Sequence, residues 1–203
     1  MALSAGLAGY WGLATSKPAP VVLVLGDSLS AEYGLQRGQG WVSLLSTQLT
    51  ADKNPAQVVN ASLSGETTAG GRSRLPALLQ QHPATVVIIE LGGNDALRGL
   101  ALKQTQENLL AMSMAAKVAG AQVLLLGMQM PPNYGADYAQ QFSKVYSDVA
   151  RQSQARLLPF FLHGVGDDPD PLKWFQADRI HPNAAAQPRL LKNVWPQLQA
   201  LLH

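Results

Sequence analysis

The sequence predicts an α/β fold in which helices cover both faces of a five-stranded parallel sheet. Five short apolar runs are too continuous for half-exposed strands, and they are typical of strands that are buried on both faces. Segments with helical spacing separate these runs. Because strands and helices alternate, we expect a doubly wound, three-layer α/β/α arrangement. The 203 residues fit one such domain.

Each expected element follows from a local pattern of apolar residues. The expected strands are residues 21–25, 57–61, 86–91, 123–127 and, the weakest, 157–161. Between and after them, apolar residues recur at three- and four-residue intervals, as on one face of a helix. These residues are Trp41, Leu44, Leu45 and Leu49; Leu75, Leu78 and Leu79; Leu109, Leu110, Met112, Met114 and Val118; Tyr138, Phe142, Val145, Tyr146 and Val149; and Leu190, Leu191, Val194, Leu198 and Leu201.

The composition excludes several classes of function. The chain is 47% hydrophobic and 14% charged, so it can bury a core. Its formal charge of +2, without any run of basic residues, does not indicate a nucleic-acid-binding protein. The absence of cysteine excludes disulfides, a thiol nucleophile and a cysteine zinc site. One histidine near acidic residues is not a ligand set, so we expect neither a metal nor a cofactor.

The first 20 residues form a leader or signal-like segment, and the domain is expected over residues 21–203. Residues 2–14 have the length of a signal-peptide core, and Ala14-Thr15-Ser16 offers small residues for cleavage. The usual positive charge before that core is missing, so a floppy or surface-packed leader is the alternative. No stretch reaches the roughly 18–20 apolar residues of a spanning helix, and we expect no integral membrane segment.

The chemistry is expected at one edge of the sheet, since active sites of doubly wound folds lie beyond the carboxyl ends of the strands. The loops there are rich in glycine or polar residues. They cover residues 26–30, 62–68, 92–95 and 128–134, and a last loop ends at residues 178–183.

Two of these loops supply a nucleophile and a base. Ser28 follows the first strand at an expected strand-to-helix turn, where a helix N-cap is the alternative interpretation. Asp178 lies three residues before His181, so its carboxylate can reach one ring nitrogen in a turn. The other nitrogen is then free to take the proton of the serine, as nucleophilic catalysis requires.

Donors for a tetrahedral oxyanion come from three loops. The Ser28 amide, the Gly65 amide and the Asn94 side chain can each donate a hydrogen bond. Ordinary turn chemistry is the alternative for the glycine and the asparagine. Asp27 and Asp95 adjoin these positions and are interpreted as orienting or structural hydrogen-bonding residues.

Four blocks in register with the strands resemble the GDSL, or SGNH, hydrolase superfamily. They are G-D-S-L-S at residues 26–30, S-G-E-T-T at 64–68, G-G-N-D at 92–95 and D-R-I-H at 178–181. Further stretches at residues 40–45, 75–79, 127–135, 157–162, 174–176 and 181–188 are similar to one branch. That branch contains bacterial multifunctional acyl-CoA thioesterase I, protease I and lysophospholipase L1, also described as arylesterase.

The resemblance implies a flavodoxin-like SGNH-hydrolase fold and a serine esterase that acts through an acyl-enzyme. Ser28 would be the nucleophile, His181 the general base and Asp178 the residue that orients the base. The Ser28 amide, the Gly65 amide and the Asn94 side chain would form the oxyanion hole. The branch acts in the periplasm, which suggests a periplasmic or secreted protein. The missing basic start leaves a cytoplasmic location as the alternative.

The expected substrate is a small acyl ester or thioester, hydrolysed by a monomer. A long acyl chain needs an apolar trough, and methionine suits a chain of variable shape. The trough candidates are Leu97, Leu100, Met128, Met130, Pro131 and Tyr134, each with a place in the ordinary core as the alternative. A carbohydrate acetylesterase of the same superfamily and a non-catalytic lipid-binding module are the competing functions. A nucleotide-binding domain is disfavoured, since no glycine-rich phosphate loop follows a strand.

Overall fold

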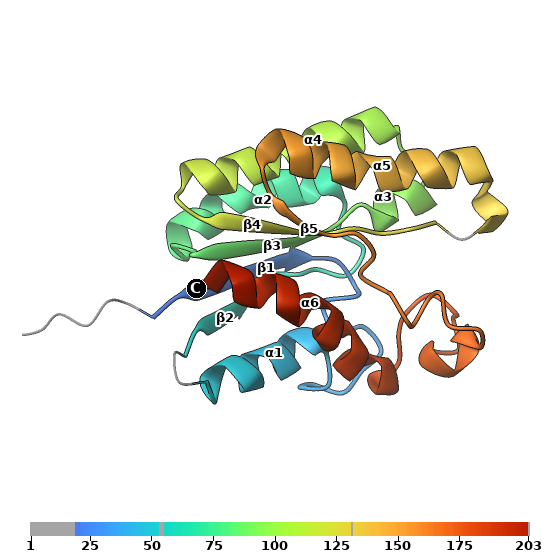
Figure 1. Cartoon of the computed structure of the whole chain (residues 1–203), viewed down its shortest axis with the longest axis horizontal. Helices are drawn as coiled ribbons and strands as arrows, with labels where there is room; N and C mark the ends of the chain where they lie inside the picture. The colour runs from blue at the N-terminus through green and yellow to red at the C-terminus, as the bar shows by residue number, and fades with distance from the viewer. Residues whose placement is uncertain (1–18, 53–54, 131, 203) are drawn as a thin grey trace, which may run out of the picture.

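A computed structural model of the chain describes residues 19–52, 55–130 and 132–202, and it confirms the predicted α/β fold (Figure 1). Five strands form one sheet in the order β2-β1-β3-β4-β5, and every neighbouring pair is parallel. The strands are β1 (Val21–Gly26), β2 (Gln57–Asn60), β3 (Val86–Glu90), β4 (Gln122–Leu126) and β5 (Arg156–Leu158).

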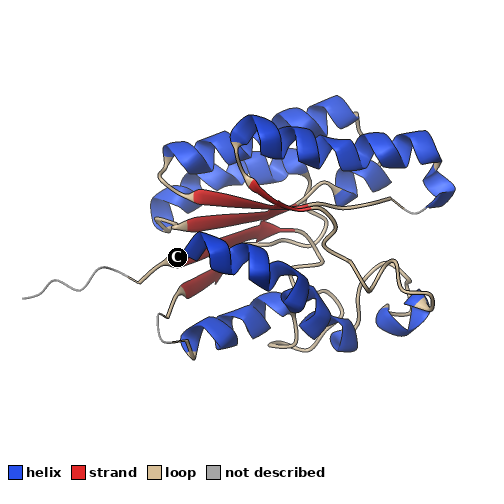
Figure 2. Cartoon of the chain, in the orientation of Figure 1, coloured by secondary structure: helices blue, strands red, loops and turns tan. Residues whose placement is uncertain are grey.

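Helices cover both faces of the sheet, as Figure 2 shows. The α-helices are α1 (Trp41–Thr50), α2 (Thr68–Gln81), α3 (Gly93–Leu97), α4 (Leu102–Val118), α5 (Ala136–Ser153) and α6 (Gln187–Leu202). Short 3₁₀ helices span Pro132–Tyr134, Pro171–Trp174 and Ala184–Ala186. Helices α1 and α6 pack together on one face, while α2, α4 and α5 pack side by side on the other (Figure 1).

The strand order explains this division of the helices. The chain runs from β1 outward to β2, then crosses back over β1 to β3. Crossover connections between parallel strands are right-handed, so reversing the direction of winding moves the helices to the opposite face. The reversal lies between β1 and β3, and such a switch point opens a crevice at the carboxyl ends of the strands. Ser28 follows β1 and Asn94 follows β3, so both lie at this crevice.

Burial on both faces is confirmed for the three inner strands and is wrong for the edge strands. All of β3 is buried, as are β1 from Val22 and β4 from Val123. In β2, Gln57 and Asn60 are exposed and the two valines between them are half-buried. An edge strand has only one neighbour, so its outer side faces solvent whatever its sequence.

The apolar face expected for the third helix is also wrong in part. Leu109 and Met112 of α4 are buried, but Met114 is 46% exposed and Val118 is 87% exposed. At 3.6 residues per turn, Met114 stands about 200° around the helix axis from Met112, on the solvent side. The expectations for residues 1–18 and for Pro131 lie outside the described residues. Among the described helices, none is long and apolar enough to cross a membrane.

Candidate active site

The turn that carries Ser28 is built by the residue before it. Strand β1 ends at Gly26, turns follow, and α1 begins only at Trp41 with Gly40 as its N-cap. The expected strand-to-helix turn, and with it the interpretation of Ser28 as an N-cap, is therefore wrong. Asp27 shapes the turn instead: its Oδ1 accepts from the Leu29 amide at 3.0 Å. The Leu29 amide is therefore held in place by the Asp27 side chain and not by an α-helix that begins at this turn.

Ser28, His181 and Asp178 form one chain of hydrogen bonds. His181 Nε2 lies 2.9 Å from Ser28 Oγ, and His181 Nδ1 lies 2.7 Å from Asp178 Oδ2. Asp178 Oδ1 accepts from the amides of Ile180 at 2.9 Å and His181 at 3.0 Å. These backbone donors, helped by the imidazole, lower the pKa of the Asp178 carboxyl from 3.8 to about 2. The carboxylate is therefore ionised, and it faces the imidazole nitrogen remote from the serine.

Two residues without a predicted role connect the histidine loop to the serine loop. The Gln176 amide donates to His181 O at 2.8 Å, and Gln176 Nε2 donates to Tyr33 O at 2.8 Å. The ring of Tyr33 lies 4.3 Å from the imidazole of His181, centroid to centroid. Gln176 belongs to a stretch that resembles the thioesterase branch, and this resemblance was the available signal. The position of Tyr33 had no sequence signal.

Asn94 lies between the two other loops of the expected oxyanion hole. It is in the first turn of α3, a short helix where the sequence predicted a loop. Its Nδ2 donates to Asp27 Oδ2 at 3.0 Å and to Glu66 O at 3.0 Å. Both acceptors sit on the nitrogen side, so the orientation of the amide is defined. Asn94 is thereby tied to the turn that carries Ser28 and to the residue after Gly65.

Glycine is required at two positions of this arrangement. Gly65 has a φ of +79°, a left-handed conformation that other residues rarely adopt. Gly92, the N-cap of α3, has a φ of +117°, and a Cβ there would lie 2.4 Å from Tyr146 Oη. A side chain at Gly92 would therefore displace either the start of α3 or the buried Tyr146.

Asp95 connects the helices behind the site. It is buried, and its carboxylate accepts from the Thr68 amide at 2.9 Å and from the Thr68 hydroxyl. Asn108 Nδ2 in turn donates to Thr68 Oγ1 at 3.1 Å. This network joins α3 to the start of α2 and to α4, which agrees with the structural interpretation of Asp95.

Asp27 and Glu90 are buried next to each other beneath Asn94. Asp27 is 3% exposed and Glu90 is 1% exposed. Burial raises the pKa of Asp27 from 3.8 to about 6. Burial, together with the neighbouring Asp27, raises the pKa of Glu90 well above its ordinary value. The sequence signal for Glu90 was a carboxyl at the end of an otherwise apolar strand.

The residues predicted to form an acyl trough fall into two groups. Leu97, Leu100 and Tyr134 are exposed, whereas Met128 and Met130 belong to the buried core. Leu97 ends α3 and Leu100 follows it, so both stand beside Asn94 along the chain. The exposed residues remain available to a bound chain, and the ordinary core accounts for the two methionines.

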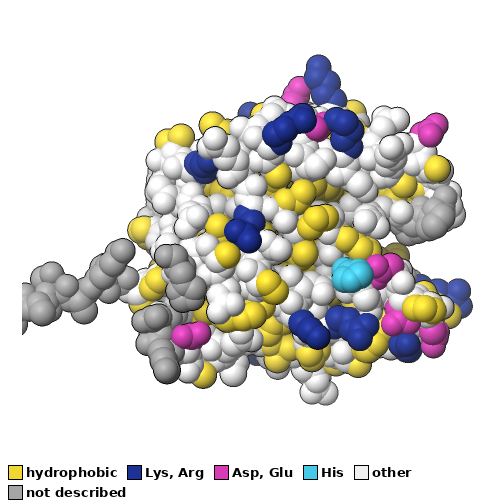
Figure 3. Space-filling view, in the orientation of Figure 1, with side chains coloured by type: hydrophobic (Ala, Val, Ile, Leu, Met, Phe, Trp, Pro, Cys, Tyr) yellow, Lys and Arg dark blue, Asp and Glu magenta, His cyan; other side chains and the backbone are white. Residues whose placement is uncertain are grey.

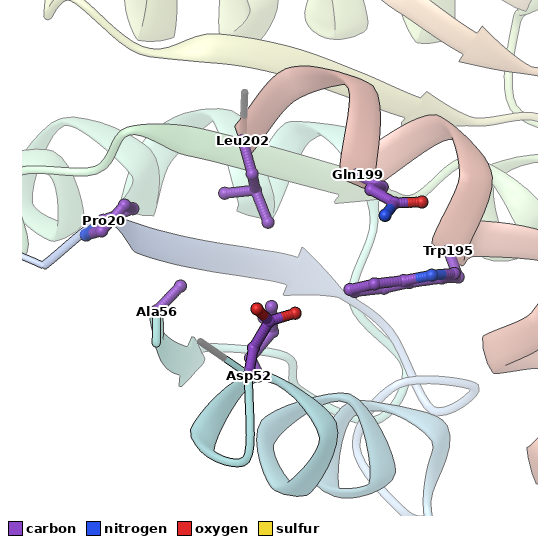
Figure 4. Close-up of a pocket in the computed structure, with 7 residues that line it drawn as sticks. Pro20, Asp52, Ala56, Trp195, Gln199 and Leu202 are labelled. Carbon is purple, nitrogen blue, oxygen red and sulfur yellow. The ribbon is translucent and has the colours of Figure 1, made fainter. Parts of the chain in front are cut away.

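Other surfaces offer less chemistry. A pocket between α1, α6 and the start of β1 is lined by Pro20, Ala56 and Trp195, among others (Figure 4). Pro20 and Ala56 precede β1 and β2, so this pocket lies at the opposite edge of the sheet from Ser28. On the face in Figure 3, basic and acidic side chains are interspersed. Over the residues that the structure describes, no group of three or more His, Asp or Glu side chains could hold a metal ion.

Comparison with known proteins identifies the family of the chain. Residues 24–188 match the GDSL-like Lipase/Acylhydrolase family. The chain belongs to this family. The match includes Ser28, Gly65, Asn94, Asp178 and His181, and therefore spans all the expected site residues of this GDSL-like protein.

Individual relatives cover nearly the whole GDSL-like chain. Esterase TesA of Pseudomonas aeruginosa is 55% identical over 184 residues, which are 91% of this chain and 90% of that protein. A crystal structure of TesA has a TM-score of 0.85 and 55% identity, covering 89% of this chain and 99% of that one. Thioesterase 1/protease 1/lysophospholipase L1 of Escherichia coli is 42% identical over 185 residues, 91% of this chain and 86% of that protein.

A third relative was solved with an inhibitor. The psychrotrophic esterase EstA of Pseudoalteromonas sp., inhibited by monoethylphosphonate, has a TM-score of 0.84 and 38% identity. The match covers 90% of this chain and 98% of that one. Coverage this complete, at these TM-scores, means that the chain shares its overall fold with these esterases.

Proposed function

We propose that this chain is a serine hydrolase of acyl esters and thioesters, with Ser28, His181 and Asp178 as its catalytic triad. The observation that carries the proposal is the continuous chain of hydrogen bonds, 2.9 Å from serine to histidine and 2.7 Å from histidine to aspartate. A nucleophile, a base and a group that orients the base are the parts that acyl transfer needs. The names of the relatives, an esterase and a thioesterase, support the same reaction class.

In the proposed reaction Ser28 Oγ attacks the acyl carbon while His181 Nε2 takes the serine proton. The tetrahedral intermediate carries a negative oxygen, which the Ser28 amide, the Gly65 amide and the Asn94 side chain would stabilise. The intermediate collapses, the bond to the leaving group breaks, and the imidazolium returns its proton to the departing oxygen or sulfur. Water then attacks the acyl-enzyme by the same route, releasing the carboxylic acid and restoring Ser28.

The polar chemistry of the site is the same for an ester and for a thioester, because the carbonyl is common to both. We propose medium- or long-chain acyl groups as the preferred substrates, since exposed Leu97 and Leu100 offer apolar surface beside Asn94 along the chain, and Tyr134 offers a further exposed apolar side chain. The thioesterase and lysophospholipase activities in the name of the Escherichia coli relative support acyl-CoA and lysophospholipid as natural substrates to test.

The first experiment is hydrolysis of p-nitrophenyl esters from acetyl to palmitoyl, with wild type and Ser28→Ala side by side. Serine-dependent turnover of medium or long chains supports the proposal. Turnover restricted to acetyl favours a carbohydrate acetylesterase instead. No turnover of any chain, together with no labelling of Ser28 by a fluorophosphonate, would leave the lipid-binding module as the better hypothesis.

We also propose that the protein is exported and monomeric. The apolar residues 2–14 and the small residues at 14–16 support a cleaved leader. Mass spectrometry of the N-terminus in each cell fraction tests this: a chain shortened near residue 16 outside the cytoplasm supports export, and a full-length cytoplasmic chain contradicts it. Light scattering of the purified protein tests the monomer, which a mass of twice the chain would contradict.

A further inference from the structure

Two carboxyl groups meet behind the candidate oxyanion hole, and no lysine or arginine among the described residues bonds to either of them. Asp27 follows β1 directly, and β1 pairs with β3 so that Gly26 stands opposite Glu90. The Asp27 amide donates to Glu90 Oε2 at 3.3 Å, and the Ser30 hydroxyl donates to the same oxygen at 2.8 Å. Within the described part of the chain, the hydrogen bonds to these two carboxyls come from neutral groups of Leu29, Asn94, Ser30 and the Asp27 backbone.

The fold makes room for this pair and seals it from solvent. A Cβ at Gly26 would lie 2.8 Å from Glu90 Oε2, so the glycine of the G-D-S block is what lets the Glu90 carboxyl lie against β1. Trp41 Nε1 donates to Ser30 Oγ at 3.2 Å, and the indole is fully buried. Two negative charges in such a place would repel each other without water to screen them, so the second charge is costly.

The hydrogen bonds decide which group stays ionised. Asp27 accepts two N–H bonds, one on each oxygen, and both stabilise its charged form. Glu90 is more deeply buried, and the interaction between the two side chains lowers the pKa of Asp27 while it raises that of Glu90. Since Glu90 Oε2 already accepts two bonds, Glu90 Oε1 is the oxygen left to carry the proton. With the proton there, a neutral glutamic acid would donate to an aspartate.

We propose that Asp27 and Glu90 share one proton and that the Asp27 carboxylate positions the oxyanion hole by holding both the turn of Ser28 and the amide of Asn94. The inference rests on the proposed function. Asp27 Oδ1 fixes the Leu29 amide next to Ser28, and Asp27 Oδ2 takes one N–H of Asn94. The other N–H of Asn94 donates to Glu66 O when no substrate is bound, and this N–H is the one available to an oxyanion. Asp27 and Glu90 are positioning residues, because neither would touch the substrate.

The principal test is a double-mutant cycle on kcat between Asp27→Asn and Asn94→Ala. The first substitution keeps an oxygen for the Leu29 amide but turns an NH₂ group toward Asn94 Nδ2. We expect Asp27→Asn alone to lower kcat by roughly 10- to 100-fold with KM changed by less than about threefold. In the Asn94→Ala background the same change should cost less than about threefold, since the group through which it acts is gone. An equal cost in both backgrounds, or no cost in either, overturns the positioning role.

The Glu90→Gln variant distinguishes a pair of carboxyls that shares one proton from a pair in which both carboxyls are ionised. Glutamine mimics a neutral, donating Glu90, so kcat should stay within about threefold of wild type at pH 8. A loss as large as that of Asp27→Asn overturns the assignment of the proton. Glu32→Gln is the matched control, because Glu32 is a carboxyl of the same loop that accepts from the Gly40 amide and the Ser43 hydroxyl and has no bond to Asn94.

Two spectroscopic measurements need no turnover and also remain useful if Asp27→Asn folds poorly. The infrared difference between wild type and Glu90→Gln at pH 8 should contain the carbonyl stretch of one protonated carboxyl, and its absence overturns the shared proton. The NMR resonance of the Asn94 side-chain amide should shift as Asp27 titrates near pH 6. A resonance that does not change over this titration overturns the proposal that Asp27 positions Asn94.

Those measurements must allow for the other groups around the pair. The nearby His181 lowers the pKa of Asp27. The carboxyl groups of Glu90, Asp27 and Asp95 together raise the pKa of Tyr146 in α5. The resonance is therefore followed in His181→Gln as well, where a shift near pH 6 that persists belongs to Asp27. Absence of Ser28-dependent turnover in wild type would overturn the proposed function alone, since the infrared and resonance results are independent of it.

Discussion

Ser28 Oγ and His181 Nε2 lie 2.9 Å apart although 153 residues separate them in the chain. The parallel sheet produces this contact. Ser28 follows β1, the central strand of the β2-β1-β3 unit, and His181 lies in the long connection that follows β5. Because all five strands point the same way, both segments emerge at one edge. Gln176 then completes the approach by bonding the Tyr33 carbonyl on the serine side.

Removing the hydroxyl of Ser28 should abolish covalent catalysis and leave the fold intact. Ser28→Ala is expected to lower kcat by on the order of 10³-fold or more, as other triad removals do. The measurement is kcat on a p-nitrophenyl ester, with circular dichroism to verify folding. Ser43→Ala is the control, since it removes a half-buried serine hydroxyl that bonds Glu32 and lies outside the triad. Equal rates for Ser28→Ala and wild type would exclude Ser28 as the nucleophile.

Asp178→Asn should stop the reaction by reversing the tautomer of His181. The asparagine oxygen can still accept from the Ile180 and His181 amides, which leaves an NH₂ group facing His181 Nδ1. The proton then moves to Nε2, which can no longer accept from Ser28. We expect kcat to fall by roughly 10³- to 10⁴-fold. Retention of more than a tenth of the rate would show that Asp178 does not orient the base.

The acid limb of the rate profile should not report Asp178. The pKa of its carboxyl is lowered to about 2, so it loses its charge only at pH values near 2. The base His181 must instead be neutral to accept a proton from Ser28. We therefore expect kcat to fall as the pH decreases at pH values well above the titration of Asp178. A rate that stays flat from about pH 8 to 5 would contradict a histidine base.

Asn94→Ala is expected to lower kcat by roughly 10²-fold with little change in KM, because an oxyanion donor acts mainly in the transition state. The substitution also leaves Asp27 Oδ2 without its N–H donor. Thermal unfolding of the variant must accordingly be measured beside the kinetics. A loss confined to KM, in a protein that unfolds like wild type, would count against Asn94 as an oxyanion donor.

The sequence predicted which loops meet at the edge of the sheet better than it predicted the structure around them, and the reason is physical. Ser28, Asp178 and His181 could be found because each follows a strand, and strand order is not needed to know that parallel strands end at one edge. The contact of Asp27 with Glu90 spans 63 residues and depends on β1 lying beside β3. The apolar pattern revealed a carboxyl in β3, but it could not reveal which group the carboxyl meets.

Local conformation was predicted less well at the turns. The loop of Ser28 was expected to enter a helix, yet a series of turns held by side chains such as Asp27 and Glu32 precedes α1. Those hydrogen bonds join residues that come together only once the whole loop has folded, so a local sequence pattern does not predict them. Asn94 was placed in a loop because α3 is only five residues long and its N-cap and first residue, Gly92 and Gly93, are both glycines. Glycine is a poor helix former, so propensity alone points away from a helix there.

The buried charge of Asp27 should make stability depend on pH. A carboxyl whose pKa is raised by folding binds its proton more tightly in the folded state, so the free energy of unfolding falls as pH rises from 3.8 to about 6. At about 1.36 kcal/mol per pKa unit, the decrease is roughly 3 kcal/mol. In Asp27→Asn this contribution disappears, so the difference in stability between variant and wild type should shift in favour of the variant between about pH 4 and 7. Urea denaturation at both pH values measures it, and a constant difference would contradict a raised pKa for Asp27.

Preference for long acyl chains should depend on the exposed leucines beside Asn94. Leu97 is 47% exposed and can bury its remaining apolar surface against a bound chain. Full burial of a leucine is worth about 1.5–3 kcal/mol, so covering the exposed half is worth roughly 1 kcal/mol, or about fivefold in kcat/KM. We expect Leu97→Ser to lower kcat/KM about fivefold for a long-chain ester and to leave acetyl ester hydrolysis unchanged.

The chain offers a matched control for this test. Met114 is 46% exposed, but it lies on the solvent side of α4, so Met114→Ser removes a similar amount of exposed apolar surface away from Asn94. If both serine variants reduce long-chain turnover equally, the effect is a general loss of surface hydrophobicity. If only Leu97→Ser does so, and in proportion to the length of the acyl chain, the apolar contact belongs to the substrate site. No change in either variant would mean that the acyl chain leaves the serine by another path, and Leu100→Ser and Tyr134→Ser would then be compared in the same series.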